Sequence, residues 1–413
     1  MLLYYIYNIF VYIAGFFLKI IALFNTKLNL FVQGRKTVFQ TLSDTISATD
    51  KVIWFHTASL GEFEQGLPVL EALKAQYPNH KFLLTFFSPS GYEVKKDSGV
   101  ADIITYLPLD TKANARKFLA LTHPELVVFV KYEFWPNYLA ELKKSNIHTI
   151  SISTIFRKSQ VFFKFYGGWM RKSLRAFHHI FVQDETSQQL LKRINYTDVT
   201  ISGDTRFDRV LEILDRDNSL SFVEDFKNNT PTVVIGSSWA EDEAIFVPFI
   251  NATTEHCKFI IAPHNIKQAE IQKLKSSITK ATVLYSERAQ HKDLSQFEVF
   301  IVDTIGILTK VYSYADIAYV GGGMGTSGLH NTLEPAVFGI PVVIGKNYTG
   351  FKEAEDLVAL GGIVSVTSKV SFQQVMHRLL TDADYKKAIG AINDAYVRSN
   401  GNACEIIMRY LNR

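Results

Sequence analysis

The chain has 413 residues, of which 47% are hydrophobic, and 44 Lys and Arg against 40 Asp and Glu leave a net charge of +4. This length exceeds what a single hydrophobic core usually supports, so we expect two domains. The modest positive charge excludes a nucleic-acid partner and fits acidic small ligands or anionic lipids better. The two cysteines, Cys257 and Cys404, indicate neither a disulfide framework nor a zinc site.

The first predicted element is an apolar helix at the N-terminus. Residues 1–24 read MLLYYIYNIFVYIAGFFLKIIALF, interrupted by Asn8 and Lys19. A helix of this length roughly covers the ~30 Å hydrocarbon core of a bilayer, so we expect a membrane anchor over residues 1–26. A cleaved signal peptide is disfavoured, because no basic residue precedes the apolar run. A buried or interfacial helix is the alternative, since Lys19 shortens the run and tyrosines suit headgroup depth.

Basic residues follow the predicted anchor, namely Lys27, Arg35 and Lys36. Positive flanking charge is typical of the cytoplasmic side of a membrane helix. We therefore expect the body of the protein to face the cytosol.

Short β-branched and aromatic runs alternate with longer amphipathic stretches from Lys51 onward. This alternation predicts an α/β fold, in which helices connect the strands of a parallel sheet. The expected strands of the first half are 52–56, 82–87, 103–106, 126–130, 149–153, 180–183 and 199–201. Those of the second half are 233–235, 259–262, 283–285, 299–302, 317–320, 342–344 and 363–366, and a closing helix is expected over 402–411.

A charged and polar segment, residues 215–230, separates the two series of strands and suits an exposed connector. We therefore expect Rossmann-like domains over residues 27–214 and 215–413. Doubly wound sheets bind ligands outside the carboxyl ends of their strands, so the functional residues should lie in the loops that follow strands, around a shared cleft.

The loop after the first expected strand carries a candidate catalytic carboxylate, Glu62. Ala58, Ser59 and Gly61 let a substrate come close to the backbone, and helix-start amides favour an anionic group there. Glu62 follows near the expected helix start and projects toward the cleft. The alternative is a first-turn glutamate that only complements the helix dipole.

A second carboxylate, Glu133, follows the fourth expected strand. It lies in the sequence KYEFWPN at 131–137, where Pro136 suits a first helical turn. We expect Trp135 to serve packing rather than sugar stacking, because large aromatic side chains at domain edges usually contribute to the core.

The loops of the second half offer sites for an anion and a ribose. Residues 236–239, 263–265 and 303–306 each follow an expected strand, although a lone His264 is more often a satisfied histidine than a ligand contact. The glycine-rich run at 321–328 costs backbone entropy, which predicts close approach of a ligand or of another backbone. Asn331 and Glu334 share one side of a helix start, where they either grip a ribose or cap the helix. These loops predict a nucleotide-sugar cleft.

Six of these segments, taken in order, resemble the transferases of lipopolysaccharide synthesis that move 3-deoxy-D-manno-octulosonic acid (Kdo). They read ASLGE at 58–62, EFWPN at 133–137, GDTRFDR at 203–209, PH at 263–264, DTIG at 303–306 and HNTLE at 330–334. The resemblance covers nearly the whole chain and implies the GT-B fold. It further implies a metal-independent, inverting transfer of Kdo from CMP-Kdo to a lipid A precursor, on the cytoplasmic side of the bacterial inner membrane.

The resemblance also implies roles for matched residues. Glu62 corresponds to the general base, which must lie within hydrogen-bond reach of the acceptor hydroxyl. Glu133 and Arg206 fall on motifs that look functional. CMP binding maps onto Pro263, His264, Ile305, Gly306, Ile307, Asn331, Thr332, Leu333 and Glu334. Ile307 departs from the glutamate that many members carry, so any contact there must come from its backbone; Lys131 also departs from the usual short polar or acidic residue.

Three other functions are compatible with parts of the sequence. One is a GT-B transferase that uses a UDP-sugar, and another is a UDP-sugar 2-epimerase of the same fold, which has no need of the apolar N-terminus. The third is a catalytically silent membrane-binding module, which the intact pair Gly61 and Glu62 argues against.

Basic and aromatic residues are interleaved between Phe156 and Phe177. We expect this segment to meet an anionic membrane surface, with aromatics at headgroup depth and cations near phosphates. The alternative is an ordinary amphipathic segment whose aromatic side chains enter the core.

Overall fold

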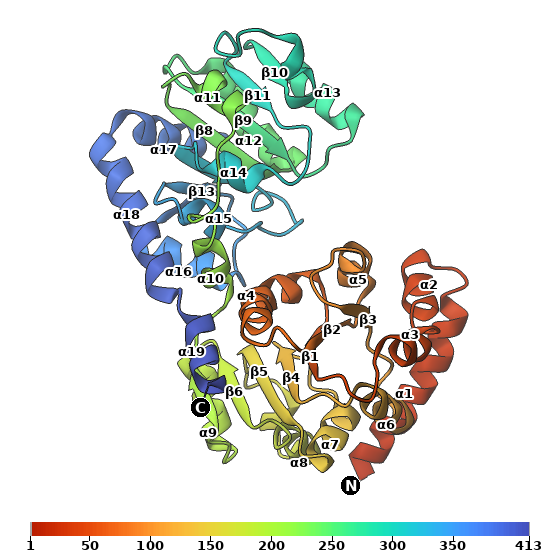
Figure 1. The fold of residues 1–413 in the computed structure, drawn as a ribbon. Helices are drawn as coiled ribbons and strands as arrows, with labels where there is room; N and C mark the ends of the chain where they lie inside the picture. The colour runs from red at the N-terminus through yellow and green to blue at the C-terminus, as the bar shows by residue number, and fades with distance from the viewer. Residues whose placement is uncertain (1, 413) are drawn as a thin grey trace. The chain divides into compact units, whose positions relative to one another are not determined.

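The computed structural model describes residues 2–412, so residues 1 and 413 of the predicted domains lie outside the described part (Figure 1). The chain divides into two compact units. Unit 1 comprises Met1–Arg209 and Gly401–Arg413, and unit 2 comprises Val210–Asn400. Each unit is built around one seven-stranded, wholly parallel sheet.

The sheet of unit 1 has the strand order β3-β2-β1-β4-β5-β6-β7. Its strands are β1 (Val52–Thr57), β2 (Lys81–Phe86), β3 (Ile103–Tyr106), β4 (Leu126–Val130), β5 (His148–Thr154), β6 (His179–Val182) and β7 (Val199–Ile201). All six residues of β1 are buried, because helices cover both faces of a parallel sheet. Trp54 enters the core on one face and Phe55 the core on the other, as strand alternation requires.

The helices of unit 1 connect these strands. They are α4 (Leu60–Gln76), α5 (Pro89–Lys95), α6 (Lys112–Thr122), α7 (Pro136–Lys144), the short η1 (Val161–Phe163), α8 (Gly168–Leu174) and α9 (Glu185–Arg193). Three helices precede the sheet, α1 (Leu2–Ile21), α2 (Thr26–Gln33) and α3 (Val38–Thr45). α1 is long and apolar enough to cross a membrane by length and composition.

The sheet of unit 2 has the strand order β10-β11-β9-β8-β12-β13-β14. Its strands are β8 (Thr232–Ser238), β9 (Lys258–Pro263), β10 (Thr282–Leu284), β11 (Val299–Ile301), β12 (Ile317–Val320), β13 (Val342–Ile344) and β14 (Ile363–Ser365). The helices of this part of the chain are α10 (Arg206–Leu211), α11 (Ser221–Lys227), α12 (Ala240–Ala252), α13 (Gln268–Ser277), η2 (Tyr285–Gln290), α14 (Leu308–Tyr312), α15 (Leu333–Ala336), α16 (Lys352–Leu360), α17 (Lys369–Thr381) and α18 (Ala383–Asn400).

The sequence predicts all fourteen strands within a few residues of their observed ends. The division of the chain differs from the expected one. The first stretch of unit 1 ends at Arg209, and the predicted closing helix, α19 (Ala403–Leu411), belongs to unit 1 rather than to the second domain. The physical reason is burial: Ile407 is fully buried in a unit 1 core, and the Tyr410 ring contacts His179 and Phe181.

Candidate active site

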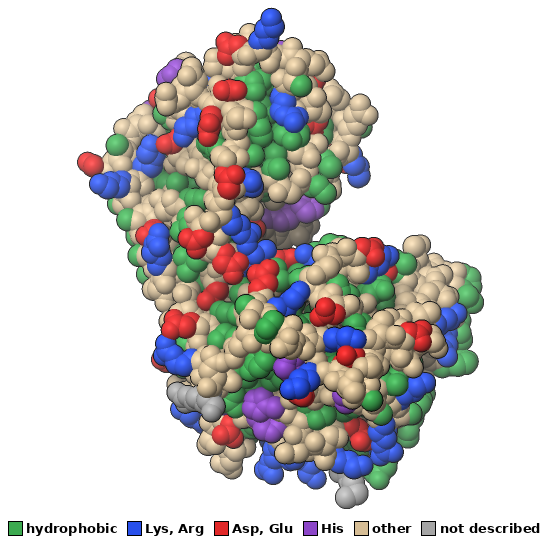
Figure 2. All heavy atoms as spheres, in the orientation of Figure 1, with side chains coloured by type: hydrophobic (Ala, Val, Ile, Leu, Met, Phe, Trp, Pro, Cys, Tyr) green, Lys and Arg blue, Asp and Glu red, His purple; other side chains and the backbone are tan. Residues whose placement is uncertain are grey.

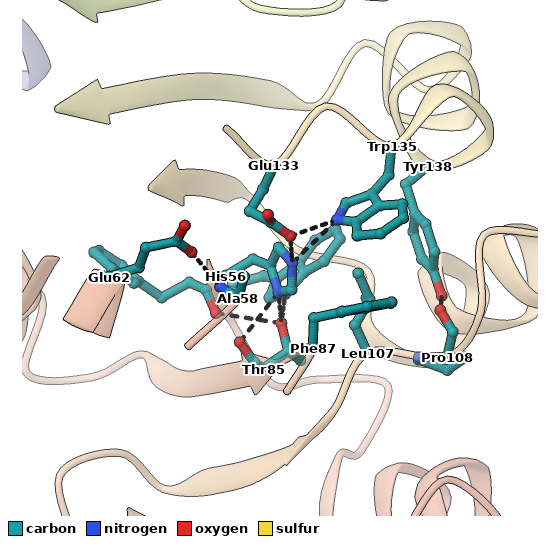
Figure 3. Close-up of polar contacts among 12 residues, drawn as sticks. His56, Ala58, Glu62, Thr85, Phe87, Leu107, Pro108, Glu133, Trp135 and Tyr138 are labelled. Carbon is teal, nitrogen blue, oxygen red and sulfur yellow. Dashed lines mark hydrogen bonds and ion pairs between the residues drawn. The ribbon is translucent and has the colours of Figure 1, made fainter. Parts of the chain in front are cut away.

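The end of β1 and the start of α4 place Glu62. Ser59 is the extended residue before the helix, which begins at Leu60, earlier than the sequence predicts. Glu62 therefore lies in the first turn, and its Oε2 accepts a 2.6 Å hydrogen bond from the backbone N–H of Ala58 (Figure 3). This bond ties the carboxylate to the loop residue just before the N-cap, at the end of the helix where the dipole favours a negative charge, as the helix-dipole alternative requires.

A role at the helix start alone does not explain the raised pKa of Glu62. Burial, followed by the negative charge of Glu133, raises the pKa of Glu62 to about 7, against the lowering effects of the Ala58 amide and of Lys131. A carboxyl whose pKa lies near neutral pH is half ionised there and can both take up and release a proton. The side chain is partly exposed, so its carboxylate can be reached by a substrate.

A buried polar network lies beside Glu62 (Figure 3). Nε2 of His56, which is fully buried in β1, lies 2.9 Å from Oε2 of Glu133. The same oxygen accepts a 2.8 Å bond from Nε1 of Trp135. On its other side, Nδ1 of His56 lies 2.8 Å from Oγ1 of Thr85. The network fixes Glu133 in place, and it gives Trp135 a polar role besides its ring contact with Phe87, which the packing interpretation of Trp135 did not include.

The backbone that carries Glu133 is strained. Lys131, directly after β4, has a φ of +67°, a conformation that costs energy for any residue except glycine. α7 then begins at Pro136, as predicted. Strain of this kind persists where the surroundings over-determine it, and here it lies at the carboxyl edge of the sheet, between β4 and the buried network.

Arg206 is tied to the same helix as Glu62 through an aspartate. Its guanidinium lies 2.8 Å from Oδ2 of Asp204, and both carboxylate oxygens of Asp204 accept from Nε2 of Gln65, at 3.0 and 3.1 Å. Gln65 is in α4, and its backbone oxygen accepts a bond from the hydroxyl of Thr205. The GDTR segment therefore braces the helix that bears Glu62.

Three aromatic rings form a stack at the carboxyl edge of the unit 2 sheet. The Trp239 and His264 rings lie 4.3 Å apart at an interplanar angle of 21°, and His264 and His330 lie 4.6 Å apart. Nε1 of Trp239 also donates a 3.1 Å bond to Nε2 of His330. Burial lowers the pKa of His330, which is consistent with this neutral, accepting nitrogen. His264 is thus part of a built cluster rather than a lone histidine.

The glycine-rich run is held by backbone contacts and by a buried carboxylate. A Cβ on Gly321 would lie 2.4 Å from the Ser237 oxygen, and one on Gly322, whose φ is +90°, would lie 2.1 Å from the Gly328 oxygen. Asp242, fully buried in α12, accepts from the Gly322 amide and from the Tyr319 hydroxyl, both at 2.8 Å. Of the two causes expected for this glycine density, close approach of another backbone accounts for these positions.

The remaining predicted donor residues lie in loops at the same edge. Nδ2 of Asn331 bonds Oε1 of Glu334 at 3.1 Å, so the two side chains do share one side, and the Thr309 hydroxyl reaches Oε2 of Glu334 at 3.3 Å. Thr332 is buried, and its Oγ1 has no hydrogen-bond partner within the described residues. The other members are Pro263 at the end of β9, Ile305, Gly306 and Ile307 before α14, and Leu333 at the start of α15.

The structure thus brings the predicted residues of each unit to the carboxyl edge of that unit's sheet. The predicted site residues do not include His56, Trp239, Asp242 and His330, although Trp239 and His330 lie in segments that the sequence analysis singled out. A histidine inside an apolar strand is the signal that could have found His56. A Trp three residues before an Asp at a helix start is the signal that could have found Trp239 and Asp242. Among residues 2–412, no group of three or more His, Cys, Asp or Glu side chains is placed to hold a metal ion.

Solved structures share this architecture. UDP-GlcNAc 2-epimerase from Neisseria meningitidis, bound to UDP-GlcNAc, matches with a TM-score of 0.61 over 87% of this chain and 99% of that one, at 17% identity. A complex of Anabaena Alr3699/HepE with UDP matches with a TM-score of 0.50 over 88% and 99%, at 12% identity. Identities this low establish the fold alone, which is GT-B-like.

Sequence relatives establish the family. The model of the family described as 3-deoxy-D-manno-octulosonic-acid transferase (kdotransferase) matches residues 33–209. The 3-deoxy-D-manno-octulosonic acid transferase of Aquifex aeolicus is 30% identical over 71% of this chain and 75% of its own. That of Chlamydophila psittaci is 26% identical over 80% of this chain and 79% of its own. The ordered motifs, the GT-B-like fold and these relatives together show that the chain belongs to the Kdo transferase family of glycosyltransferases.

Proposed function

We propose that this enzyme transfers Kdo from CMP-Kdo to a hydroxyl of a lipid A precursor, with inversion at the anomeric carbon and release of CMP. The observation that carries the proposal is Glu62, a partly exposed carboxyl at a helix start whose pKa lies near 7. A base for a sugar hydroxyl needs this combination of access and ionisation.

In the proposed step Glu62 accepts the proton of the acceptor hydroxyl while the hydroxyl oxygen attacks the anomeric carbon of Kdo. The bond from that carbon to the phosphate oxygen of CMP breaks, and the oxygen keeps its electron pair. Glu62 then returns the proton to water. Glu133, held by His56 and Trp135, keeps the proton affinity of Glu62 high through its negative charge. Arg206 positions α4 through Asp204 and Gln65.

The donor is assigned to the carboxyl-edge loops of unit 2. CMP-Kdo offers a phosphate, ribose hydroxyls and a base, and these loops offer an aromatic stack and a buried hydroxyl without a partner. Thr332 supports the assignment, because its buried Oγ1 lacks a partner and a buried hydroxyl is normally hydrogen-bonded. The contacts proposed for CMP are with Pro263, His264, Ile305, Gly306, Ile307, Asn331, Thr332, Leu333 and Glu334.

The N-terminal helix supports a lipid acceptor and a location at a membrane. α1 leaves large apolar side chains exposed, Phe10 at 65% and Phe16 at 62% among them, which is unfavourable in water. A lipid substrate requires an enzyme at a membrane surface. We therefore place the catalytic body at the cytoplasmic face of the bacterial inner membrane.

One experiment tests the reaction and separates it from the alternatives. The purified chain is incubated with a tetraacylated lipid A precursor and either CMP-Kdo or UDP-GlcNAc, with and without a chelator, and the lipid is analysed by mass spectrometry. We expect a mass gain of one or more Kdo units with CMP-Kdo alone, unaffected by the chelator. Transfer of GlcNAc, absence of Kdo transfer to the lipid, or dependence on a divalent ion would each overturn the proposal.

A further inference from the structure

A cavity of about 850 Å³ lies in unit 1 between the start of α1, α7 and α8. Apolar and aromatic side chains line it, including Tyr4, Pro136 and Trp169, and three cations, Lys143, Lys172 and Arg175, share its wall. The cations are exposed, and within the described part of the chain none of the three forms an ion pair. The cavity therefore combines an apolar interior with uncompensated positive charge.

The chain segment that carries these cations is poor in acidic residues, and Glu141, which precedes Lys143 on α7, is paired with Arg116. Residues 142–183 contain eight Lys and Arg and no Asp or Glu. A second cavity, of about 480 Å³, shares Lys172 and Arg175 with the first and adds Arg171 and Arg193. Figure 2 shows Lys and Arg side chains gathered along the edge of unit 1 where Figure 1 places α7 and α8. This concentration of charge favours an anionic partner.

One face of α1 packs against the rest of unit 1. The less exposed residues of the helix recur at helical spacing, namely Tyr4, Tyr7, Asn8, Val11, Ala14, Gly15 and Leu18. The Tyr4 hydroxyl donates to Oδ1 of Asn137 and the Tyr7 hydroxyl to Oδ2 of Asp110, both at 2.7 Å. Further along, Gly15 lies against Leu109. The helix is therefore attached along most of its length rather than at one end.

The opposite face of α1 is apolar and exposed. It carries Leu2, Tyr5, Ile6, Ile9, Phe10, Tyr12, Ile13, Phe16, Phe17 and Ile20. A helix attached along one side cannot cross the bilayer without taking the charged surface of unit 1 into the hydrocarbon, which is costly. Its free face can instead lie in the membrane plane, a few ångströms below the headgroups. In that position the cavity at the start of α1 is at the depth of lipid phosphates.

The aromatic residues of the 156–177 segment divide accordingly. Phe156, Phe162 and Phe177 are buried in the core of unit 1, as the amphipathic alternative requires. Phe165 is 95% exposed and Tyr166 is 48% exposed, and both line the cavity. The membrane interpretation is thus limited to the η1–α8 connection and α8.

From these observations we propose that the cavity between α1, α7 and α8 binds an anionic membrane phospholipid. Its phosphate lies against Lys172 and Arg175, and the first part of an acyl chain lies against Tyr4, Trp169 and the exposed Phe165. α1 lies in the membrane plane beside it. The ligand is a structural lipid of the bilayer rather than the acceptor, and binding needs neither donor nor transfer.

The test is flotation of the full chain with phosphatidylcholine vesicles, with and without phosphatidylglycerol. We expect tighter binding to the anionic vesicles. Lys172→Gln with Arg175→Gln removes two cations and should weaken binding to anionic vesicles about thirtyfold, with little change on phosphatidylcholine. The matched control is Lys369→Gln with Lys387→Gln, which removes two exposed cations of unit 2 and should retain the preference.

A second variant separates a cavity from diffuse surface charge. Ala140 is exposed and lines the cavity, so Ala140→Trp fills it without changing the charge or the core. The cavity proposal expects the preference for phosphatidylglycerol to be lost, with the melting temperature unchanged. Full preference in Ala140→Trp, or equal losses in the control pair, would overturn the proposal. A third set of phosphatidylcholine vesicles contains a lipid A precursor, and a preference for these but not for those with phosphatidylglycerol would also overturn the proposal. Transfer activity is not measured, so this outcome is independent of the proposed reaction.

Discussion

Units 1 and 2 place their candidate residues at the same edge of the same kind of sheet, but they use different chemistry there. Unit 1 buries charge: His56, Glu133 and Trp135 form one network, and Glu62 beside it has a perturbed pKa. In unit 2 the candidate residues shape a loop: its glycines allow backbones to meet, and the buried carboxylate of Asp242 fixes the loop by accepting a hydrogen bond from the Gly322 amide. In the proposed function, proton transfer belongs to the first unit and recognition of the nucleotide to the second.

The largest expected effect comes from the base. Glu62→Gln removes the proton acceptor, so we expect kcat to fall about a thousandfold while the Kd for CMP stays unchanged. Single-turnover transfer and calorimetric titration with CMP measure the two quantities. Near-normal transfer would contradict the division of labour between the units, as would a matching loss of CMP binding.

Glycines of the two units should respond differently to an added methyl group. Gly322→Ala places a Cβ 2.1 Å from a carbonyl oxygen at a φ of +90°, so we expect a loss of about 3 kcal/mol in the free energy of unfolding. Gly61→Ala meets no atom within 4 Å and lies in a helix, so stability should hold or rise by up to about 1 kcal/mol. Thermal unfolding measures both.

The transfer kinetics of Gly61→Ala test whether the small side chain of Gly61 serves the approach of the acceptor. If Gly61 is small so that substrate can approach, KM for the acceptor rises although the fold is intact. An unchanged KM would remove Gly61 from the acceptor site.

Thr332→Val tests whether the unpaired hydroxyl of Thr332 forms a hydrogen bond with the bound donor. No hydrogen bond within the described residues is lost, so stability without ligand should be unchanged, whereas CMP should bind about tenfold more weakly. Thr232→Val is the matched control, because its buried hydroxyl donates to the Thr230 oxygen, so that variant should lose stability and keep CMP affinity. Identical CMP affinity in Thr332→Val would exclude this residue from the donor site.

The smallest expected effect is a shift in pH dependence. The active form of Glu62 is the carboxylate, so kcat/KM should fall tenfold per pH unit below about pH 7. Glu133→Gln removes the negative charge that raises the pKa of Glu62, so the acidic limb should move to lower pH. A limb that stays in place would show that burial alone sets the ionisation of Glu62.

The sequence predicted those features of the fold and the site that depend on residues close together in the chain. Alternating hydrophobic runs located every strand, Pro136 marked the start of α7, and the three-residue spacing put Asn331 beside Glu334. Strand alternation could not show that His56 meets Glu133, because that contact joins β1 to the loop after β4 in space. The backbone that Gly321 approaches is distant in the sequence, and the one that Gly322 approaches depends on the path of a loop. The sequence therefore could not decide whether a ligand or another backbone comes close to these glycines.

The placement of α19 has a consequence for how this protein is made. The last helix completes the core of unit 1, yet the whole of unit 2 separates it from the rest of that unit in the chain. During synthesis the apolar positions on α4 that receive Ile407 therefore stay uncovered until α19 has been made. A nascent chain released early would leave this surface open to chaperones and proteases.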